Sequence, residues 1–387
     1  MMKKIRILII SVCCLIAKSS IAENVSFVFY GKNINVRIFN KQDFRVADAS
    51  PKNISDAWRY LAENANETLQ DCLSLKKELR LNDWGYLRLL SKLSSACFGK
   101  TNEAELIKGF LFANSGYQTS FGNIEDRIYM LYCSKDVVYN RPFFTSEGDT
   151  YYFDDSVSVK TLTIAPPYKG KALSFDIKVL PKLPLAETPK RDLQSKKYPD
   201  IRVSVSVNKN LVDFFSDYPP TMKNYDLMTR WAILGNAPLD EYVKAQIYPM
   251  LKNELKGLSK LESVERLLNF MQTAFIYNYD EKVWGHDRAF FSEETMYYQY
   301  SDIEDRSILL SRLVRDLLGL EVVLLYYSNP AHLPIGIHFD EEVDGEYVIY
   351  NGDKFMICDP VYINAQVGKV MSLYKNEEPE KIILLYR

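Results

Sequence analysis

The sequence contains little histidine and cysteine, which limits the chemistry that it can perform. Its 387 residues include three histidines and six cysteines, and no two cysteines have CxxC spacing. Zinc-finger patterns and paired redox cysteines are therefore missing from the sequence. The histidines, His286, His332 and His338, all lie in the last third of the chain. Histidine-dependent chemistry is thereby confined to that third.

The sequence also lacks a long basic block and, after residue 22, a long apolar run. The basic stretch at residues 190–197 is short, so we do not expect nucleic acid as a partner. The apolar runs beyond residue 22 are too short to span a bilayer, so we expect no transmembrane segment.

The first 22 residues have the pattern of a secretory signal peptide. A basic start precedes an apolar run from Ile7 to Ala17 and small residues at Ser20 and Ala22. We therefore expect cleavage after Ala22 and export, to a periplasm or to the exterior. Residues 1–22 hold four basic residues and no acid, so cleavage changes the net charge from −2 to −6.

Four cysteines remain after this cleavage. An exported protein can oxidise its thiols, but a chain of this size buries enough apolar surface to fold without disulfide bonds. We expect buried free thiols for most of them, and one disulfide among the first three stays open as the alternative. The four are Cys72, Cys97, Cys133 and Cys358.

The composition and periodicity of the remaining chain predict an α+β fold. The 27 tyrosines and 20 phenylalanines favour strand-containing cores. Alternating apolar residues predict strands at residues 23–48 and 157–220. Helical spacing predicts helices between residues 55 and 97 and beyond 220. Ser259 and Glu262 have the spacing of a capping box at the start of one of these helices.

The first and last thirds of the chain resemble each other. Each predicts a helix followed by strands and then a Gly-Asp pair. The pair at residues 148–149 matches the pair at residues 352–353, and Asp155 falls opposite Asp359. Many α+β units share this order of elements, but the matched residues favour a diverged duplication. The expected segments are a signal peptide at residues 1–22, a short β segment at 23–48, a degenerate first copy at 49–156, a β-rich linking module at 157–222 and a second copy at 223–387.

Residues 297–320, YYQYSDIEDRSILLSRLVRDLLGL, predict a helix whose first turn is suited to a reactive group. Ser301 and Glu304 have capping-box spacing, and Gly319 ends the apolar periodicity. The first turn of a helix stabilises a thiolate or an oxyanion through its backbone amides and its dipole. The residue at this place is Ile303, which cannot ionise.

A histidine and an aspartate follow on predicted strands. His332 opens one strand, and Asp359 ends a later strand of the same predicted sheet. An aspartate that hydrogen-bonds one nitrogen of a histidine fixes the orientation of the ring. A thiol at a helix N-terminus beside such a pair would complete a Cys–His–Asp site. Cys358 is not expected to replace that thiol, because it precedes Asp359 on the strand and points to the opposite face.

Residues 276–387 resemble the bacterial transglutaminase-like superfamily, which is related to the papain-fold cysteine peptidases. The similarity rests on YSDIEDR, on VVLLYYSNPAHLPIGIHFD and on GDKFMICDP. Family members have segments similar to YSDCEDR at the first place and to CDPT at the third. The stretch ELRLNDWGYLRLLSKL is also similar to the amino-terminal part of multi-domain members. The resemblance implies a helix packed on an antiparallel sheet, a transglutaminase/papain-like core, in the second copy.

The resemblance also implies roles for individual residues. His332 occupies the general-base position and Asp359 the orienting position, whereas Ile303 stands where the family has its nucleophilic cysteine. Because isoleucine cannot attack a carbonyl carbon, we expect the covalent mechanism of the family to be lost. In the first copy Asn102 lies near the nucleophile position, and of the two partners only Asp155 is kept.

Further candidate site residues surround this motif. His338 with Asp340 or Glu341 would make a metal site only with a third ligand, and none is evident, so we expect no metal and no cofactor. The aromatic side chains near the motif can form a peptide-binding wall or pack in the core. The candidate cleft residues are Trp284, His286, Tyr298 and Tyr300.

Three functions remain open from the sequence. The first is a non-catalytic exported protein that binds a protein, a peptide or a cell-envelope component. The second is an active hydrolase or transamidase that uses another nucleophile or a metal. The third is a structural subunit in which the cleft is filled. Ile303 favours the first and the third.

Overall fold

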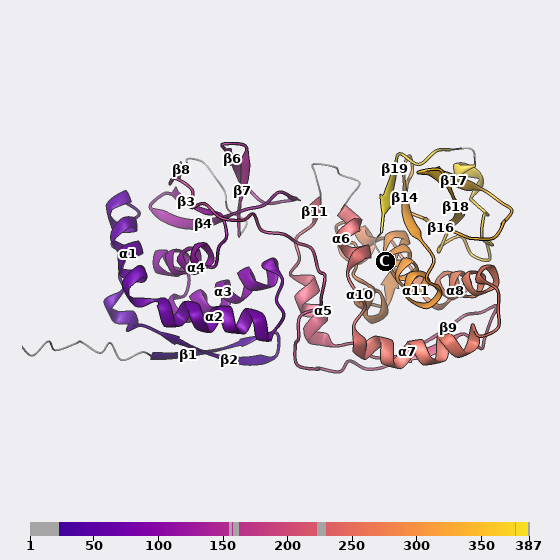
Figure 1. Ribbon diagram of the computed structural model, residues 1–387, viewed down its shortest axis with the longest axis horizontal. Helices are drawn as coiled ribbons and strands as arrows, with labels where there is room; N and C mark the ends of the chain where they lie inside the picture. The colour runs from indigo at the N-terminus through magenta and orange to yellow at the C-terminus, as the bar shows by residue number, and fades with distance from the viewer. Residues whose placement is uncertain (1–22, 155–156, 158–161, 223–229, 376, 386–387) are drawn as a thin grey trace, which may run out of the picture.

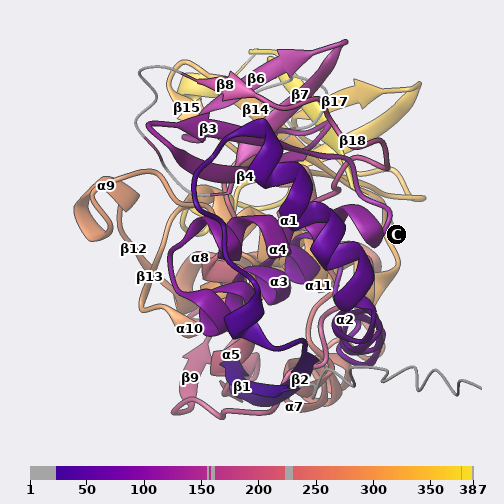
Figure 2. The same cartoon turned by 90° about the vertical axis from the view of Figure 1, so that its left-hand side faces the viewer.

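The computed structural model describes residues 23–154, 157, 162–222, 230–375 and 377–385. The expected signal peptide and Asp155 lie outside these residues. The fold is α+β with antiparallel main sheets, as the sequence predicts. No helix of the described part is long and apolar enough to cross a membrane. Figure 1 shows two lobes side by side, and in both Figures 1 and 2 the main sheets lie on the same side of the molecule with helices beneath them.

The N-terminal lobe, residues 23–183, combines a hairpin, helices and an antiparallel sheet. The hairpin strands are β1 (Glu23–Phe29) and β2 (Lys32–Ile38). The helices are α1 (Pro51–Asn64), α2 (Asn66–Glu78), α3 (Asp83–Phe98) and α4 (Asn102–Asn114). The sheet has the order β6-β7-β4-β3-β8. Its strands are β3 (Thr119–Ile124), β4 (Arg127–Cys133), β6 (Phe143–Ser146), β7 (Asp149–Phe153) and β8 (Thr163–Ile164).

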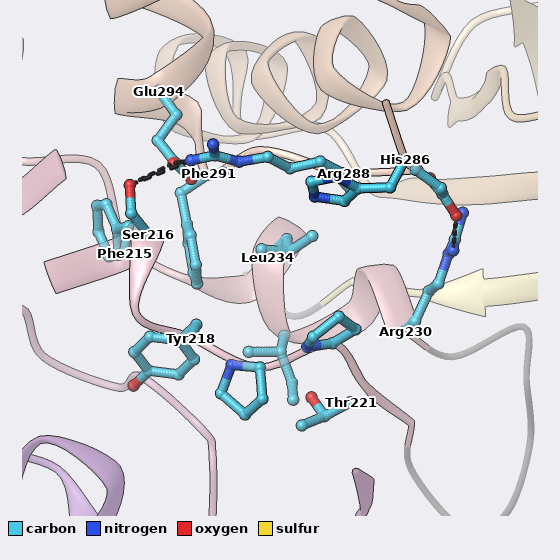
Figure 3. A pocket seen from close by; sticks show the side chains of 15 residues that line it. Phe215, Ser216, Tyr218, Thr221, Arg230, Leu234, His286, Arg288, Phe291 and Glu294 are labelled. Atoms are coloured by element: carbon cyan, nitrogen blue, oxygen red, sulfur yellow. Dashed lines mark hydrogen bonds and ion pairs between the residues drawn. The ribbon is translucent and has the colours of Figure 1, made fainter. Parts of the chain in front are cut away.

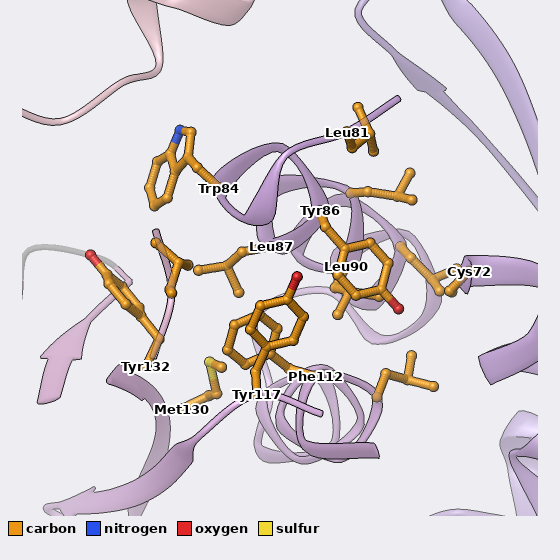
Figure 4. Packing of buried hydrophobic residues seen from close by; sticks show 14 of the residues in the cluster. Cys72, Leu81, Trp84, Tyr86, Leu87, Leu90, Phe112, Tyr117, Met130 and Tyr132 are labelled. Atoms are coloured by element: carbon orange, nitrogen blue, oxygen red, sulfur yellow. The ribbon is translucent and has the colours of Figure 1, made fainter. Parts of the chain in front are cut away.

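The core of this lobe lies between α3, α4 and the sheet. Figure 4 shows Trp84 and Leu87 of α3 near Phe112 of α4 and Tyr132 of β4. These side chains are almost fully buried, and the ring of Phe112 stacks on Tyr117 with centroids 4.2 Å apart. Burial of each large apolar side chain contributes about 1.5–3 kcal/mol, so this layer is a main source of stability in the lobe.

The C-terminal lobe, residues 191–385, surrounds one long helix, α11 (Ile303–Leu318). The other helices in this range are α5 (Lys209–Ser216), α6 (Arg230–Asn236), α7 (Glu241–Glu254), α8 (Lys260–Ala274), α9 (Asp280–Val283) and α10 (Ser292–Tyr297). The main sheet contains β14 (Val322–Ser328), β15 (Ala331–His332), β16 (Ile335–His338), β17 (Tyr347–Tyr350), β18 (Asp353–Cys358) and β19 (Lys381–Leu384). The smaller strands are β9 (Arg191–Gln194), β10 (Arg202–Val205), β12 (Ile276–Tyr277) and β13 (Tyr300–Ser301).

The helix α11 is the centre of this lobe. From Ile303 to Arg315 every residue is buried, because α6, α8, α10 and β14 all pack against it. Gly319 ends the helix in the left-handed region with φ of 69°, as the sequence predicts. The expected capping box of Ser259 and Glu262 at the start of α8 is also confirmed.

The start of α11 differs from the sequence expectation by one residue. Asp302 is the N-cap, and its N–H donates to Oδ2 of Asp305 at 3.2 Å. Ser301 ends β13 in an extended conformation, and its hydroxyl accepts from Nε of Arg306 at 3.2 Å. The expected capping box of Ser301 and Glu304 is therefore wrong, because strand pairing fixes Ser301 before the helix begins.

The expected β-rich module at residues 157–222 does not form a layer of its own. Its described strands β8, β9, β10 and β11 (Thr221–Met222) are short, and Lys209–Ser216 forms helix α5 where a strand was expected. Residues 171–190 contain no regular strand, in part because Pro181 and Pro184 cannot donate to a strand ladder. Phe175 packs in the N-terminal core and Val203 in the C-terminal core, so this stretch joins the lobes.

The two main sheets share an order of strands. In the N-terminal lobe α4 precedes β3, and the neighbours run β3-β4-β7-β6; in the C-terminal lobe α11 precedes β14, and they run β14-β16-β18-β17. The hairpins β6–β7 and β17–β18 also turn alike. Glu147 and Gly148 have φ of 53° and 86°, and Asn351 and Gly352 have φ of 53° and 94°. Positive φ at both central residues suits a tight hairpin, which explains why both turns contain glycine.

Candidate functional site

The first turn of α11 contains no reactive side chain at its start. Ile303 is the first residue of the helix and is 7% exposed. Its side chain belongs to the apolar cluster that also contains Leu333 and Cys358. The backbone amides of the first turn remain suited to an anion, but Ile303 supplies only apolar surface.

A buried His–Asp pair lies on the neighbouring sheet. Nε2 of His332 lies 2.9 Å from Oδ2 of Asp359, and the residues are 8% and 2% exposed. The other oxygen of Asp359 accepts from the backbone N–H groups of Val361 and Tyr362 at 3.0 and 3.1 Å. These bonds fix the carboxylate, so it holds the imidazole in one orientation.

The ring of His332 is also held by stacking. The ring of Tyr374 lies parallel to it, with centroids 4.7 Å apart and an interplanar angle of 4°. The Tyr374 hydroxyl donates to the carbonyl oxygen of Pro330 at 3.3 Å. Since Nε2 donates to Asp359, the lone pair of the neutral imidazole is on Nδ1. The pair therefore has the form of a general base with its orienting carboxylate.

A hydrogen bond joins α11 to the strand that carries the histidine. The hydroxyl of Ser307 donates to the carbonyl oxygen of Leu333 at 2.5 Å. Ser307 lies about one turn after Ile303, and Leu333 follows His332 directly. The first two turns of α11 therefore lie beside the His332 strand.

The neighbouring hydroxyl and thiol groups do not replace a nucleophile at residue 303. The hydroxyl of Ser307 donates to Leu333, and that of Ser301 is buried against Arg306. Cys358 is fully buried, and burial raises the pKa of its thiol well above the ordinary value. It lies in the apolar core, as the strand alternation predicts.

All four cysteines beyond residue 22 are free, so the expected free thiols are confirmed and the alternative disulfide is not formed. Cys72, Cys133 and Cys358 are buried, and Cys97 is half-buried.

A cavity of about 230 Å³ lies between α5, α6 and the segment that precedes α10 (Figure 3). Apolar side chains and nitrogen donors both come from α6 and from the segment before α10, and α5 adds Phe215. Arg288 pairs with Glu294 at 2.8 Å, and Arg230 pairs with Asp287. Arg230 also lies 3.7 Å from Glu304, so the cavity adjoins the start of α11. The lining includes Phe215, Tyr218, Leu234, Phe291, Arg230, His286 and Arg288.

The four candidate cleft residues occupy different places. Exposed His286 lines the cavity, and its Nδ1 lies 3.0 Å from the carbonyl oxygen of Trp284. Trp284 and Tyr298 pack edge to face with centroids 4.8 Å apart, and the guanidinium of Arg288 lies 4.5 Å from the centroid of Trp284. Tyr300 lies half-buried in β13. Sequence reasoning missed Arg288, which joins this aromatic group to the cavity.

The structure also gathers acidic residues that sequence reasoning did not connect. Asp280, Asp302 and Glu304 are buried, and one carboxylate oxygen of each lies within 4.8 Å of the others. Burial raises the pKa of Asp302, and the charges of Glu304 and Asp305 raise it further. Burial likewise raises the pKa of Asp280 to about 6. By contrast, Nδ1 of His338 lies 3.0 Å from the carbonyl oxygen of Lys354.

The N-terminal lobe has a different polar group at the end of β7. Asp154 is buried and contacts Nζ of Lys108 at 3.2 Å, a guanidinium nitrogen of Arg88 at 2.9 Å and the hydroxyl of Ser91 at 2.8 Å. In this lobe the carboxylate of Asp154 thus pairs with an arginine of α3 and a lysine of α4. The match between the first and last thirds of the sequence points instead to Asp155, which lies outside the described residues.

The buried carboxyl of Glu293 predicts a pH-dependent stability. It is 1% exposed, accepts from the N–H of Asp240 at 2.6 Å, and burial raises its pKa to about 8. The unfolded chain releases this proton near pH ~4.3, so the stabilising contribution of this carboxyl is largest at low pH and is lost as the pH rises towards 8.

Glu293→Gln keeps an acceptor for Asp240 but removes the ionisation. Between pH 5 and 8 the parent is expected to lose about 1–3 kcal/mol more unfolding free energy than this variant. Urea unfolding at several pH values measures the difference, with exposed Glu241→Gln as the control. Equal pH slopes for the parent and Glu293→Gln would contradict the prediction.

No known family model matches the sequence, and no curated protein matches it. The family resemblance therefore rests on the sequence motifs alone.

Proposed function

We propose that this protein is a non-catalytic, exported member of the bacterial transglutaminase-like superfamily that binds a peptide segment of a protein or cell-envelope partner. The observation that carries the proposal is the combination at the start of α11. His332 and Asp359 form a buried 2.9 Å pair beside the helix, yet the residue at its first position is Ile303. A family mechanism that needs a cysteine nucleophile cannot proceed through an isoleucine.

The shared strand order supports the proposed duplication. The runs β3-β4-β7-β6 and β14-β16-β18-β17 follow α4 and α11 in the same way. In this proposal the first copy has lost the nucleophile and the histidine: Asn102 begins its helix, and the buried carboxylate of Asp154 pairs with Lys108. The second copy has lost only the nucleophile.

The cavity beside α11 supports a binding role. Its apolar wall suits one apolar side chain of a peptide, and Arg230, His286 and Arg288 offer nitrogen donors to carbonyl or carboxylate oxygens. Because the covalent mechanism of the family needs a nucleophile that residue 303 does not supply, the proposed role of this region is recognition.

Leu234→Trp is expected to weaken peptide binding at least about tenfold, or about 1.4 kcal/mol, because the larger side chain fills the cavity. Peptides are first selected from a random heptapeptide library on the chain that begins at residue 23. Their dissociation constants are then measured by fluorescence anisotropy for the parent and for Leu234→Trp.

Ile349→Trp is the matched control, because Ile349 is an exposed aliphatic residue on β17 and does not line the cavity. It should bind the selected peptides as the parent does. If no peptide is selected, or if Leu234→Trp binds as tightly as the control, the binding proposal fails and a structural role becomes the better account.

A further inference from the structure

A second cavity lies where the two lobes meet. It has a volume of about 320 Å³ and lies between the first half of α3, the residues that follow β5 (Val137–Val138) and the α5–β11 connection, residues 217–220. Strand β5 pairs with β11, and the N–H of Tyr139 donates to the carbonyl oxygen of Pro220 at 2.9 Å. These bonds fix the α5–β11 connection against the N-terminal lobe.

A buried donor on the wall of this cavity has no acceptor in the protein. Trp84 lines the cavity and is 1% exposed, and its indole Nε1 takes part in no hydrogen bond. Figure 4 shows this nitrogen pointing away from the packed side chains of the core. The indole nitrogen can only donate, and an unpaired buried donor destabilises the fold. Trp84 therefore indicates a missing acceptor.

A second buried polar group without a partner lies nearby. The centroid of the Tyr132 ring is 6.3 Å from that of Trp84, and the Tyr132 hydroxyl is buried and takes part in no hydrogen bond. Burial and the charge of Asp154 raise the pKa of this hydroxyl, whereas the charges of Arg141 and Arg88 act to lower it. Both guanidinium groups therefore lie near the Tyr132 hydroxyl.

The charges on the cavity wall favour an anion. Arg141 is half-buried, and its guanidinium makes no hydrogen bond or ion pair with the described residues. Arg88 also lines the cavity and pairs with Asp154 at 2.9 Å. Among the described lining residues the acid is Asp217, which accepts from the hydroxyl of Tyr30 at 2.5 Å. The wall thus carries two positive charges and one negative charge, which suits a ligand with a single negative charge.

We propose that this cavity binds the carboxylate group of a small organic molecule. Arg141 offers a planar fork of donors that matches two carboxylate oxygens, and Nε1 of Trp84 offers a further donor. A carboxylate carries one negative charge, whereas a phosphate group carries up to about two. The side chains of Tyr139, Tyr218 and Pro219 line the cavity and provide contact for the carbon skeleton of the ligand.

This inference does not depend on the proposed peptide-binding cavity, because Trp84, Arg88 and Arg141 do not line that cavity. A free organic acid and the C-terminus of a peptide share the carboxylate group. The test therefore uses benzoate for the first source and the tripeptide Gly-Gly-Phe for the second.

The test follows the indole N–H signals of the chain that begins at residue 23, labelled with ¹⁵N-tryptophan, by NMR during titration with each probe. The chain has four tryptophans, and Trp84→Phe identifies the signal of Trp84. At least one of the two carboxylates is expected to shift the Trp84 signal saturably, because the indole N–H gains an acceptor. The signal of Trp58, which lies in the same lobe but does not line the cavity, should stay in place.

Arg141→Gln should weaken this binding at least about tenfold, because it removes the charged fork. Exposed Arg202→Gln on β10 is the matched control and should bind as the parent does. The tighter of the two probes identifies the source of the carboxylate. A Trp84 signal that neither probe shifts, equal binding of uncharged benzamide, a stronger response to inorganic phosphate, or unchanged affinity in Arg141→Gln would overturn the inference.

Discussion

Replacement of Ile303 by cysteine is expected to give the protein a hydrolase or transamidase activity that the unmodified chain lacks. The new thiol would stand at the first position of α11, about one turn before Ser307, whose hydroxyl donates to the carbonyl oxygen of Leu333 next to His332. The helix N-terminus and the imidazole both favour the thiolate, which is the attacking form. Loss of a nucleophile typically costs several orders of magnitude in rate, so we expect a gain of at least about 10³-fold over the parent.

The assay follows hydrolysis of a mixed peptide library and the transfer of its acyl groups to a primary amine. Ile303→Ala is the first control, because it opens the same space without a thiol. Ile303→Cys combined with His332→Ala is the second, because it keeps the thiol without its base. Turnover by the unmodified protein would contradict the proposal that it is non-catalytic.

Asp154→Asn is expected to lower the free energy of unfolding by about 3–5 kcal/mol, the usual cost of breaking a buried ion pair. Burial alone would raise the pKa of Asp154, yet Lys108 and Arg88 hold it below the ordinary value. The variant leaves the ammonium of Lys108, only 3% exposed, without this carboxylate. Its remaining partner, Glu105, lies at 3.0 Å and is shared with the N–H of Met130.

Urea unfolding of Asp154→Asn and the parent measures this loss. The control is Asp192→Asn, an exposed aspartate on β9, which should change the free energy of unfolding by no more than about 0.5 kcal/mol. A loss below about 1 kcal/mol for Asp154→Asn would show that the pair contributes little more than a surface salt bridge.

Hydrophobic periodicity predicts the helices and strands of this fold better than it predicts how they pack together. The hairpin of β1 and β2 and the strands after α4 and α11 follow from alternation and turn residues, because these depend on neighbours in sequence. Residues 171–190 alternate in the same way but make no regular strand. Leu173, Phe175 and Ile177 pack in the N-terminal core, and contacts distant in sequence decide this.

The site was predictable where it depends on known motifs. His332 and Asp359 meet as the pattern implies, but the acidic cluster was not foreseen, because Asp280 lies 22 residues before Asp302. The two residues meet because β12 and β13 pair in parallel, Ile276 with Tyr300. The acidic residues at 302, 304 and 305 were the available signal, although they give no hint that Asp280 joins them.

In the N-terminal lobe, residue spacing in the sequence selects a different aspartate from the one that the structure buries. Alignment of the two Gly-Asp pairs places Asp155 opposite Asp359. The structure places buried Asp154 directly after β7, which ends at Phe153, whereas β18 ends at Cys358. Side chains alternate between the two faces of a strand. A strand that is shorter by one residue therefore brings a different side chain to the face that packs on the helix.

The most direct test of the central claim is the alkylation rate of the Ile303→Cys thiol as a function of pH, compared with the same thiol in the His332→Ala background. The same reaction with the parent gives the background alkylation of its four native cysteines beyond residue 22. The account predicts a thiol pKa at least about one unit below the ordinary value of about 8.5, and a loss of this shift without His332. A thiol that titrates at or above the ordinary value in both backgrounds would contradict it.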